Sequence, residues 1–247
     1  MRIRFHNREF APGFFMTLSA AFFFGLFLTL GNWQLQRADL KRDIESRFVE
    51  QLQQPYQYLI LNSELNESFA YRKIKLKGVY QKDQVILLDN QVNEGVAGYH
   101  ILTPFFINGG QKAVLVNRGW VAAGADRKQF PSIKDPRVSE QVLGIVTIPT
   151  TEGYRLGQVE MGQSWPQRVP YIDLQKIQQG VSFELLPYVI WQAAEMDDYY
   201  VRNLKPVWSP PEKSEAYALQ WFSFAFIVLI LYVVLNFRKR VVGETNE

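Results

Sequence analysis

Three residues near the C-terminal end of the chain, Ser214, Tyr217 and Trp221, have a spacing that favours a binding surface. Residues at i, i+3 and i+7 lie on one face of an α-helix. A polar side chain one turn outside two aromatic side chains is typical of the rim of a site for a flat hydrophobic ligand. Tyrosine and tryptophan also gather at membrane–water interfaces. These residues alone leave both interpretations open.

Histidine and cysteine, which supply much of the chemistry of enzymes, are scarce. His6 lies in a basic leader, so His100 is the only imidazole available to the central region, and a histidine-rich metal site is excluded there. A lone histidine in a strand is more often structural than catalytic. The chain has no cysteine, which excludes disulfides, thiolate metal sites and cysteine nucleophiles. We therefore predict neither catalytic residues nor a metal site.

A hydrolase that uses His100 is the enzymatic alternative. It would need an exposed serine and a carboxylate beside the imidazole, yet the chain contains no G-x-S-x-G motif. It also contains no Walker loop and no G-x-G-x-x-G fingerprint. The net charge of +3 is too small, and too concentrated in the tails, to indicate nucleic-acid binding.

Two segments without charged side chains determine the organisation of the chain. One runs from Ala11 to Gln36, and the other contains 22 residues from Ala216 to Phe237. As a helix, the second would be about 33 Å long, enough to cross the hydrocarbon core of a bilayer. We predict transmembrane helices at 11–34 and 214–237.

The basic tails predict the orientation of these spans. A cleaved signal peptide is the competing interpretation of the first, but the apolar core is too long and no A-x-A-like site follows it. Three arginines precede the first span, and RKR follows the second at 238–240. The positive-inside rule then places the tails 1–10 and 238–247 in the cytoplasm and the region between the spans outside it.

The fold class predicted from these patterns is a membrane protein in which two transmembrane helices flank a mainly antiparallel β (α+β) extracytoplasmic domain. Leu40, Ile44, Phe48 and Leu52 predict a stalk helix at 35–54, which Pro55 ends. The β domain is predicted at 55–213. Its strands are expected at 69–81, 84–90, 98–107, 111–121, 142–149 and 188–193. Residues 108–110 (NGG) indicate a hairpin, 92–98 are rich in turn residues, and 171–180 looks helical with Gly180 as its end.

Four further residues are candidates for binding a partner protein. Arg118 and Trp120 end a predicted strand in the sequence VNRGW, where Trp120 is either a packing anchor or an interface residue. Trp33 belongs to the interfacial aromatic belt, and Arg37 can reach headgroup phosphates.

Small residues favour close packing of the two spans. These are Ala21 with Gly25 in the first span, and Ala218 with Ala225 in the second.

These segments, in this order, resemble the Surfeit locus protein 1 family of cytochrome oxidase assembly factors. The resemblance is carried by GNWQLQRADLK, YRKIKLKGVY, LLDNQVNEGVAGYHILTPF, VLVNRGWV, LLPYVIWQ and PPEKSEAYALQWF. It implies a protein of the bacterial inner membrane, with a periplasmic domain, that is not an enzyme. The implied function is assembly of a haem–copper oxidase, by assisting delivery of haem a to the catalytic subunit or by stabilising that subunit. The implied partners are this subunit, other assembly factors and the lipid bilayer.

The sequence departs from the family pattern at two positions. Members that hold haem a carry a histidine three residues before the YA of the last motif, where this chain has Ser214, and Leu40 stands where tryptophan is common. The first change removes the expected axial ligand. We therefore expect haem a to be held transiently around Ser214, Tyr217 and Trp221 without an imidazole, or not at all. The alternative is a membrane-tethered periplasmic scaffold that binds a partner protein and has no role in haem.

Overall fold

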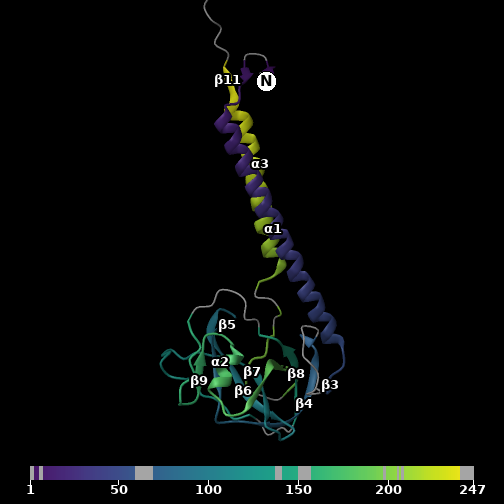
Figure 1. Ribbon diagram of the computed structural model, residues 1–247, viewed down its shortest axis with the longest axis vertical. Coiled ribbons are helices and arrows are strands. Elements are labelled where there is room, and N and C mark those ends of the chain that lie inside the picture. Colours follow the sequence, from purple (N-terminus) through teal and green to yellow (C-terminus); the bar gives the residue numbers. More distant parts are fainter. Residues whose placement is uncertain are drawn as a thin grey trace, which may run out of the picture. The chain divides into compact units, whose positions relative to one another are not determined.

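The computed structural model describes residues 3–5, 8–58, 69–136, 141–149, 157–196, 199–204, 206 and 209–239 (Figure 1). The chain divides into two compact units. One comprises residues 1–46 with 206–247, and the other comprises residues 47–205. The first unit contains nearly all the apolar helical sequence, and the second contains the β domain.

Within the described part of the chain, two helices are long and apolar enough to cross a membrane, α1 (Phe14–Gln53) and α3 (Pro211–Asn236). In the most apolar stretch of each helix, only 6% of α1 and 11% of α3 is buried in the protein. The core helix of a soluble domain would bury its apolar side chains, so this exposure fits a lipid environment. His6 and residues 240–247 lie outside the described residues. The described parts of the tails form a small sheet of β1 (Ile3–Phe5), β2 (Arg8–Phe10) and β11 (Phe237–Lys239).

The two helices pack antiparallel with a heptad-like pattern. The buried and half-buried positions of α1 include 20, 24, 27, 31, 34, 38 and 41, which follow one another in steps of four and three residues, and position 30 next to 31 is also half-buried. This spacing is typical of helices that pack at a shallow angle. A Cβ added at Gly31 would lie 2.6 Å from the Phe222 ring, so glycine is required for the close approach. On α3, the predicted packing of Ala218 and Ala225 is confirmed, since both are buried.

The matching prediction for the first span was wrong. Ala21 is exposed, and a Cβ at Gly25 would meet no heavy atom within 4 Å. Both residues lie off the heptad face, on which Gly31 and Ala38 are buried. Small residues do occupy the packed face of α1, but they are Gly31 and Ala38, and Ala21 and Gly25 lie on another face.

The β domain is built around a closed ring of five strands. In order around the ring these are β4 (Lys73–Tyr80), β8 (Gln141–Thr147), β10 (Glu184–Gln192), β7 (Lys112–Ala122) and β6 (Val96–Ile107). β6 returns to β4 through the pairs Gly78–Ile107, Val79–Phe106 and Tyr80–Phe105. β5 (Ile86–Asn93) and β9 (Gln167–Val169) extend the sheet beyond β6, and β3 (Gln57–Tyr58) extends it beyond β4.

The predicted fold class is confirmed, and all six predicted strands are present with shifted ends. Asn108 and Gly109 both have positive φ, as a tight hairpin turn between β6 and β7 requires. A second such turn at Glu94–Gly95 joins β5 to β6, so the expected turn region at 92–98 is mostly strand. β10 begins at Glu184, ahead of Pro187, and its register with β7 shifts between Leu185 and Val189. The parallel pairing of β10 with β7 was not predicted.

The predicted helix is shorter than expected. α2 (Leu174–Gln179) begins after Asp173, whose carboxylate accepts a hydrogen bond from the Lys176 backbone N–H. It ends before Gly180, as predicted. Asp173 satisfies one of the free N–H groups of the first turn, which explains why the helix begins there and not at Tyr171.

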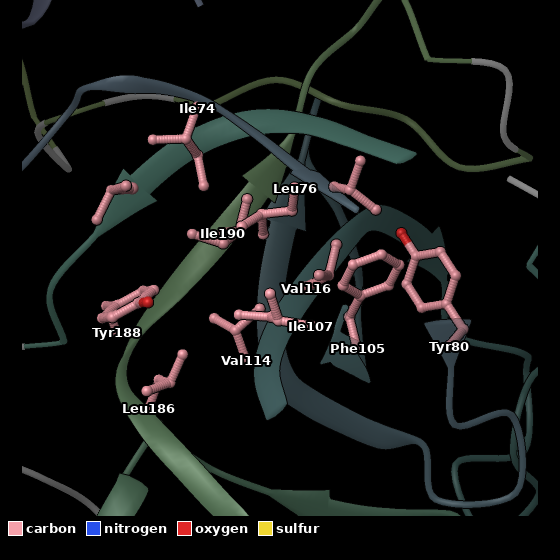
Figure 2. Packing of buried hydrophobic residues seen from close by; sticks show 12 residues of the cluster. Ile74, Leu76, Tyr80, Phe105, Ile107, Val114, Val116, Leu186, Tyr188 and Ile190 are labelled. Atoms are coloured by element: carbon pink, nitrogen blue, oxygen red, sulfur yellow. The ribbon is translucent and has the colours of Figure 1, made fainter. Parts of the chain in front are cut away.

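Apolar side chains from all five strands of the ring fill its interior (Figure 2). Tyr80 from β4 packs edge-on against Phe105 from β6, with ring centroids 4.9 Å apart. A second cluster lies around Leu115 and Val189 and includes Ile177 from α2. A third lies around Tyr99 and Ile101 on β6, with Tyr200 from the segment after β10. These clusters hold both faces of the sheet without disulfides.

Gly78 allows the ring to close. A Cβ at this position would lie 1.9 Å from the Phe106 carbonyl oxygen across the β4–β6 pairing. We expect Gly78→Ala to lower the free energy of unfolding by about 1–3 kcal/mol, as overpacking in a core does. Chemical denaturation of the full chain in neutral detergent, followed by tryptophan fluorescence, measures this. Gly124→Ala is the matched control, because no heavy atom lies within 4 Å of its added Cβ. Equal stability of the two variants would contradict the importance of this contact.

Candidate functional site

Ser214 lies in the contact between the two long helices and not on an open face. It is only 3% exposed. The Nζ of Lys41, on α1, donates hydrogen bonds to the Oγ of Ser214 and to the Oγ of Ser209, each at 2.9 Å. The heptad spacing explains the meeting, because Lys41 and Ser214 both occupy inward positions of their helices. The residue expected to face a ligand is therefore bonded to a lysine of the other helix.

Tyr217 and Trp221 point to different surroundings. Trp221 is half-buried and stacks on Phe27 of α1, with centroids 5.7 Å apart and an interplanar angle of 25°. Tyr217 is 47% exposed. The structure thus brings Ser214 and Trp221 to the side that faces α1, while Tyr217 lies on the outer surface. A shared haem-facing rim of the three residues stays a prediction.

Charged side chains surround Lys41 on the polar side of Ser214. Arg42 forms ion pairs with Asp39, at 3.1 Å, and with Glu215 across the two helices. Among the described residues, Lys41 has no carboxylate within ion-pair distance. Sequence reasoning did not find Lys41, Ser209 or Arg42. The alternation of four- and three-residue steps along α1, which includes Lys41, is a pattern of burial in the structure, so no signal in the sequence pointed to Lys41.

This arrangement does not fit an axial ligand of haem at Ser214. A neutral serine hydroxyl is not among the usual haem ligands, which are histidine, cysteinate, methionine and tyrosinate. The Lys41 amino group donates two hydrogen bonds to hydroxyl oxygens, so it is engaged as a donor. Lys213, one residue away, is exposed. Contacts to the ring of a haem at this end of the helices would have to come from apolar and aromatic side chains.

Trp33 and Arg37 form an exposed pair on α1. Trp33 is 49% exposed, and the guanidinium of Arg37 lies 5.5 Å from the centroid of its ring. The two are four residues apart, so they are neighbours on the helix surface. Both are available to lipid headgroups or to a partner, and their predicted binding role stays a prediction. Leu40, in the same motif, is 60% exposed.

Arg118 is not a surface residue. It is fully buried, and its Nη1 donates to the Lys134 carbonyl oxygen at 2.9 Å. Its guanidinium lies 5.1 Å from the Tyr200 ring centroid and 5.9 Å from that of Tyr80. The expectation that Arg118 contacts a partner protein is therefore corrected. Its side chain ties β7 to the loop around Lys134 and to the segment that contains Tyr200.

Trp120 serves as a packing anchor of the same strand end. It is half-buried, and its indole Nε1 donates to the Gln91 carbonyl oxygen at 2.9 Å. Its backbone exchanges two hydrogen bonds with Val201, at 2.7 and 3.1 Å. A Cβ on Gly98 would lie 2.5 Å from the indole, so the ring packs directly on the β6 backbone. These contacts favour the structural interpretation of VNRGW over a binding role.

His100 is buried in the sheet and lacks the neighbours of a catalytic histidine. It is 9% exposed, and its ring packs edge-on against Trp191 at 4.8 Å. Burial lowers the pKa of His100 to about 4, so the imidazole is neutral near pH 7. No serine or carboxylate is among its recorded contacts in the described part of the chain. The hydrolase alternative thus finds no triad here.

The fold defines a membrane-anchored protein with a closed β-barrel domain, and comparisons with known proteins identify its family. A model of the SURF1 family matches residues 21–226. A SURF1-like protein of Rickettsia felis is 25% identical over 228 residues, which are 89% of this chain and 95% of that protein. The cytochrome oxidase assembly protein SHY1 of Saccharomyces cerevisiae is 27% identical over 97 residues, which are 38% of this chain and 24% of that protein. Because the family model covers most of the chain, this membrane protein belongs to the SURF1 family.

The lowered pKa of His100 predicts a loss of stability in mild acid. The unfolded chain, in which histidine has a pKa of 6.5, binds a proton before the folded chain does. The free energy of unfolding should therefore fall by about 3 kcal/mol as the pH decreases from 6.5 to about 4. Denaturant titrations of the full chain in neutral detergent at a series of pH values measure this. His100→Gln, which has no proton to gain, should abolish the slope between about pH 6.5 and 5.5.

Glu195 provides an internal reference for this titration. The hydrogen bond from the Tyr56 hydroxyl lowers the pKa of Glu195 from 4.5. Its stabilising contribution is present above pH 4.5 and is lost as the pH falls through the lowered value. Glu195 therefore does not contribute to the slope above about pH 5.5. An unchanged slope in His100→Gln would show that another group causes it.

Proposed function

We propose that this protein assists the assembly of a haem–copper cytochrome oxidase. The match of the SURF1 family model to residues 21–226 is the observation that carries the proposal. The yeast relative, whose name is cytochrome oxidase assembly protein, supports the same role. The family implies a non-catalytic role, and the buried position of His100 is consistent with it.

The site of action is the bacterial inner membrane, with both termini in the cytoplasm and the β domain in the periplasm. The basic residues of the two tails support this orientation through the positive-inside rule. The catalytic subunit of the oxidase is itself the partner, together with other assembly factors and the lipid bilayer. Trp33, Arg37 and Tyr217 are exposed near the polar ends of the apolar segments and form the proposed contact surface on the helices.

The finer role is assistance in haem a delivery, or stabilisation of the subunit that receives it, without an axial ligand from position 214. Haem supplies the redox chemistry of the finished oxidase, and the described residues of this chain offer apolar and aromatic contacts to its ring. Exposed aromatic side chains on the helices, such as Tyr217 and Phe224, can pack against a flat apolar ligand or a partner helix. Contacts of this kind favour brief binding and release over storage.

Deletion of the gene separates this proposal from its alternatives. We expect membranes of the deletion strain to lose most haem–copper oxidase activity and the haem a band, while dehydrogenase activity and other terminal oxidases are retained. Oxygen consumption and reduced-minus-oxidised spectra of the membranes measure this. A general scaffold without a role in oxidases predicts no such selective loss, and that result would reject the proposal.

A matched variant tests the enzymatic alternative in the same strain. Expression of the native chain should restore oxidase activity, and His100→Gln should restore it to within about twofold at neutral pH, where the native imidazole is neutral. Failure of a folded His100→Gln protein to restore activity would favour the hydrolase.

A further inference from the structure

The Lys41 amino group carries hydrogen-bonding capacity that the described residues do not use. A lysine ammonium has three N–H donors, and two of them reach the Oγ atoms of Ser209 and Ser214. Because both hydroxyls accept from Lys41, their own hydrogens are free to donate. Neither hydroxyl donates a hydrogen bond within the described residues. One N–H and two O–H groups near the Lys41 amino group are thus available to a ligand.

The charge of Lys41 is also without a counter-ion in the described part of the chain. The nearby carboxylates of Asp39 and Glu215 both pair with Arg42. Glu45, one helical turn along α1, has no recorded ion pair or hydrogen bond with Lys41. Lys41 and Ser209 are half-buried, and Ser214 is buried. A positive charge in a partly desolvated site is stabilised when an anion pairs with it.

The ends of the charge-free segments indicate how deep Lys41 and Ser214 lie in the membrane. Lys41 lies five residues beyond Gln36, and Ser214 lies two residues before Ala216. These separations are about 7.5 Å and 3 Å along a helix, within the roughly 5–7 Å headgroup layer or at its edge. The Cα–Cβ bond of Lys41 tilts toward the N-terminus of α1, which places the amino group nearer the membrane than its Cα. Phosphate and carboxylate groups of amphiphiles lie at the same depth.

We propose that Lys41, Ser209 and Ser214 form a binding site for one anionic oxygen group, a phosphate or a carboxylate, presented at headgroup depth. The ammonium neutralises the charge, and the three donors surround the oxygens. Lys41 and Ser209 are half-buried, so part of the site is accessible. A phospholipid headgroup and the carboxylates of haem share this chemistry. The site itself does not depend on the proposed function, because lipid alone can occupy it.

Retention of an anionic lipid by the full chain tests the site. The protein is placed in discs of phosphatidylcholine with a minor fraction of phosphatidylglycerol, and bound lipid is counted by native mass spectrometry. Lys213→Gln is the matched control, since it removes the same charge at an exposed position one residue from Ser214. Lys41→Gln should bind phosphatidylglycerol about fivefold more weakly than Lys213→Gln does, which corresponds to about 1 kcal/mol. Equal binding by the two variants would overturn the proposal.

Two further variants keep the test decisive if Lys41→Gln loosens the helix pair. Lys41→Arg retains the charge and several donors, so it should retain the lipid. Ser209→Ala removes one hydroxyl at a half-buried position and should weaken binding by a smaller factor. The proposal would also be contradicted if Ser209→Ala left lipid binding unchanged while Lys41→Arg and Lys41→Gln lost it equally.

A competition arm distinguishes the two sources of the anion. Protohaem and its dimethyl ester have the same ring, but only protohaem has free carboxylates. Displacement of the lipid by protohaem and not by the ester identifies haem carboxylates as occupants of the site. Retention of the lipid against both identifies phosphate as the group that the site prefers. Displacement by both compounds alike would show that ring stacking, and not an anion, governs binding, and it would overturn the proposal.

Discussion

Strand β6 forms hydrogen bonds with three other strands, and the architecture of the β domain depends on which part of β6 pairs with which strand. Residues 96–102 pair with β5 along one edge, and residues 105–107 pair with β4 along the same edge, while β7 occupies the other edge. The change of partner converts an open sheet into a ring of five strands. It requires the two backbones to approach closely at Gly78, where no side chain would fit. The interior of the ring depends on this closure, and so does the proximity of Arg118 to Tyr80 of β4.

How well each part of the fold could be predicted depends on how far apart in the sequence the interacting residues lie. Alternation of apolar residues and turn residues such as Asn108 and Gly109 are local signals, and they located strands and hairpins well. Strand pairing is not local, so the parallel contact between β10 and β7 and the closure of the ring could not be obtained from one sequence. The same limit applies in the membrane unit. Small residues four apart pointed to Gly25, but the helix face is fixed by the partner, and it is Gly31 that meets Phe222.

The candidate site was predictable in part for the same reason. Ser214 and Trp221 were identified from their spacing, and both lie at the contact between α1 and α3. Lys41 is 173 positions away in the chain from Ser214, so no local pattern joins them. Arg118 was misplaced because arginine is usually exposed or at interfaces, whereas two tyrosine rings and a carbonyl oxygen make its burial tolerable here. A buried arginine of this kind stabilises a strand end and offers nothing to a partner.

We propose that this SURF1 family protein assists oxidase assembly without ligating haem iron at position 214. The visible spectrum of the full chain, purified from a host that makes haem a, is the decisive measurement. We expect the native protein to carry far less than stoichiometric haem a, and Ser214→His to acquire a haem spectrum with histidine ligation. Stoichiometric haem a in the native protein, lost in Lys41→Ala or Lys213→Ala, would show that the native chain ligates haem through a lysine and would contradict this role.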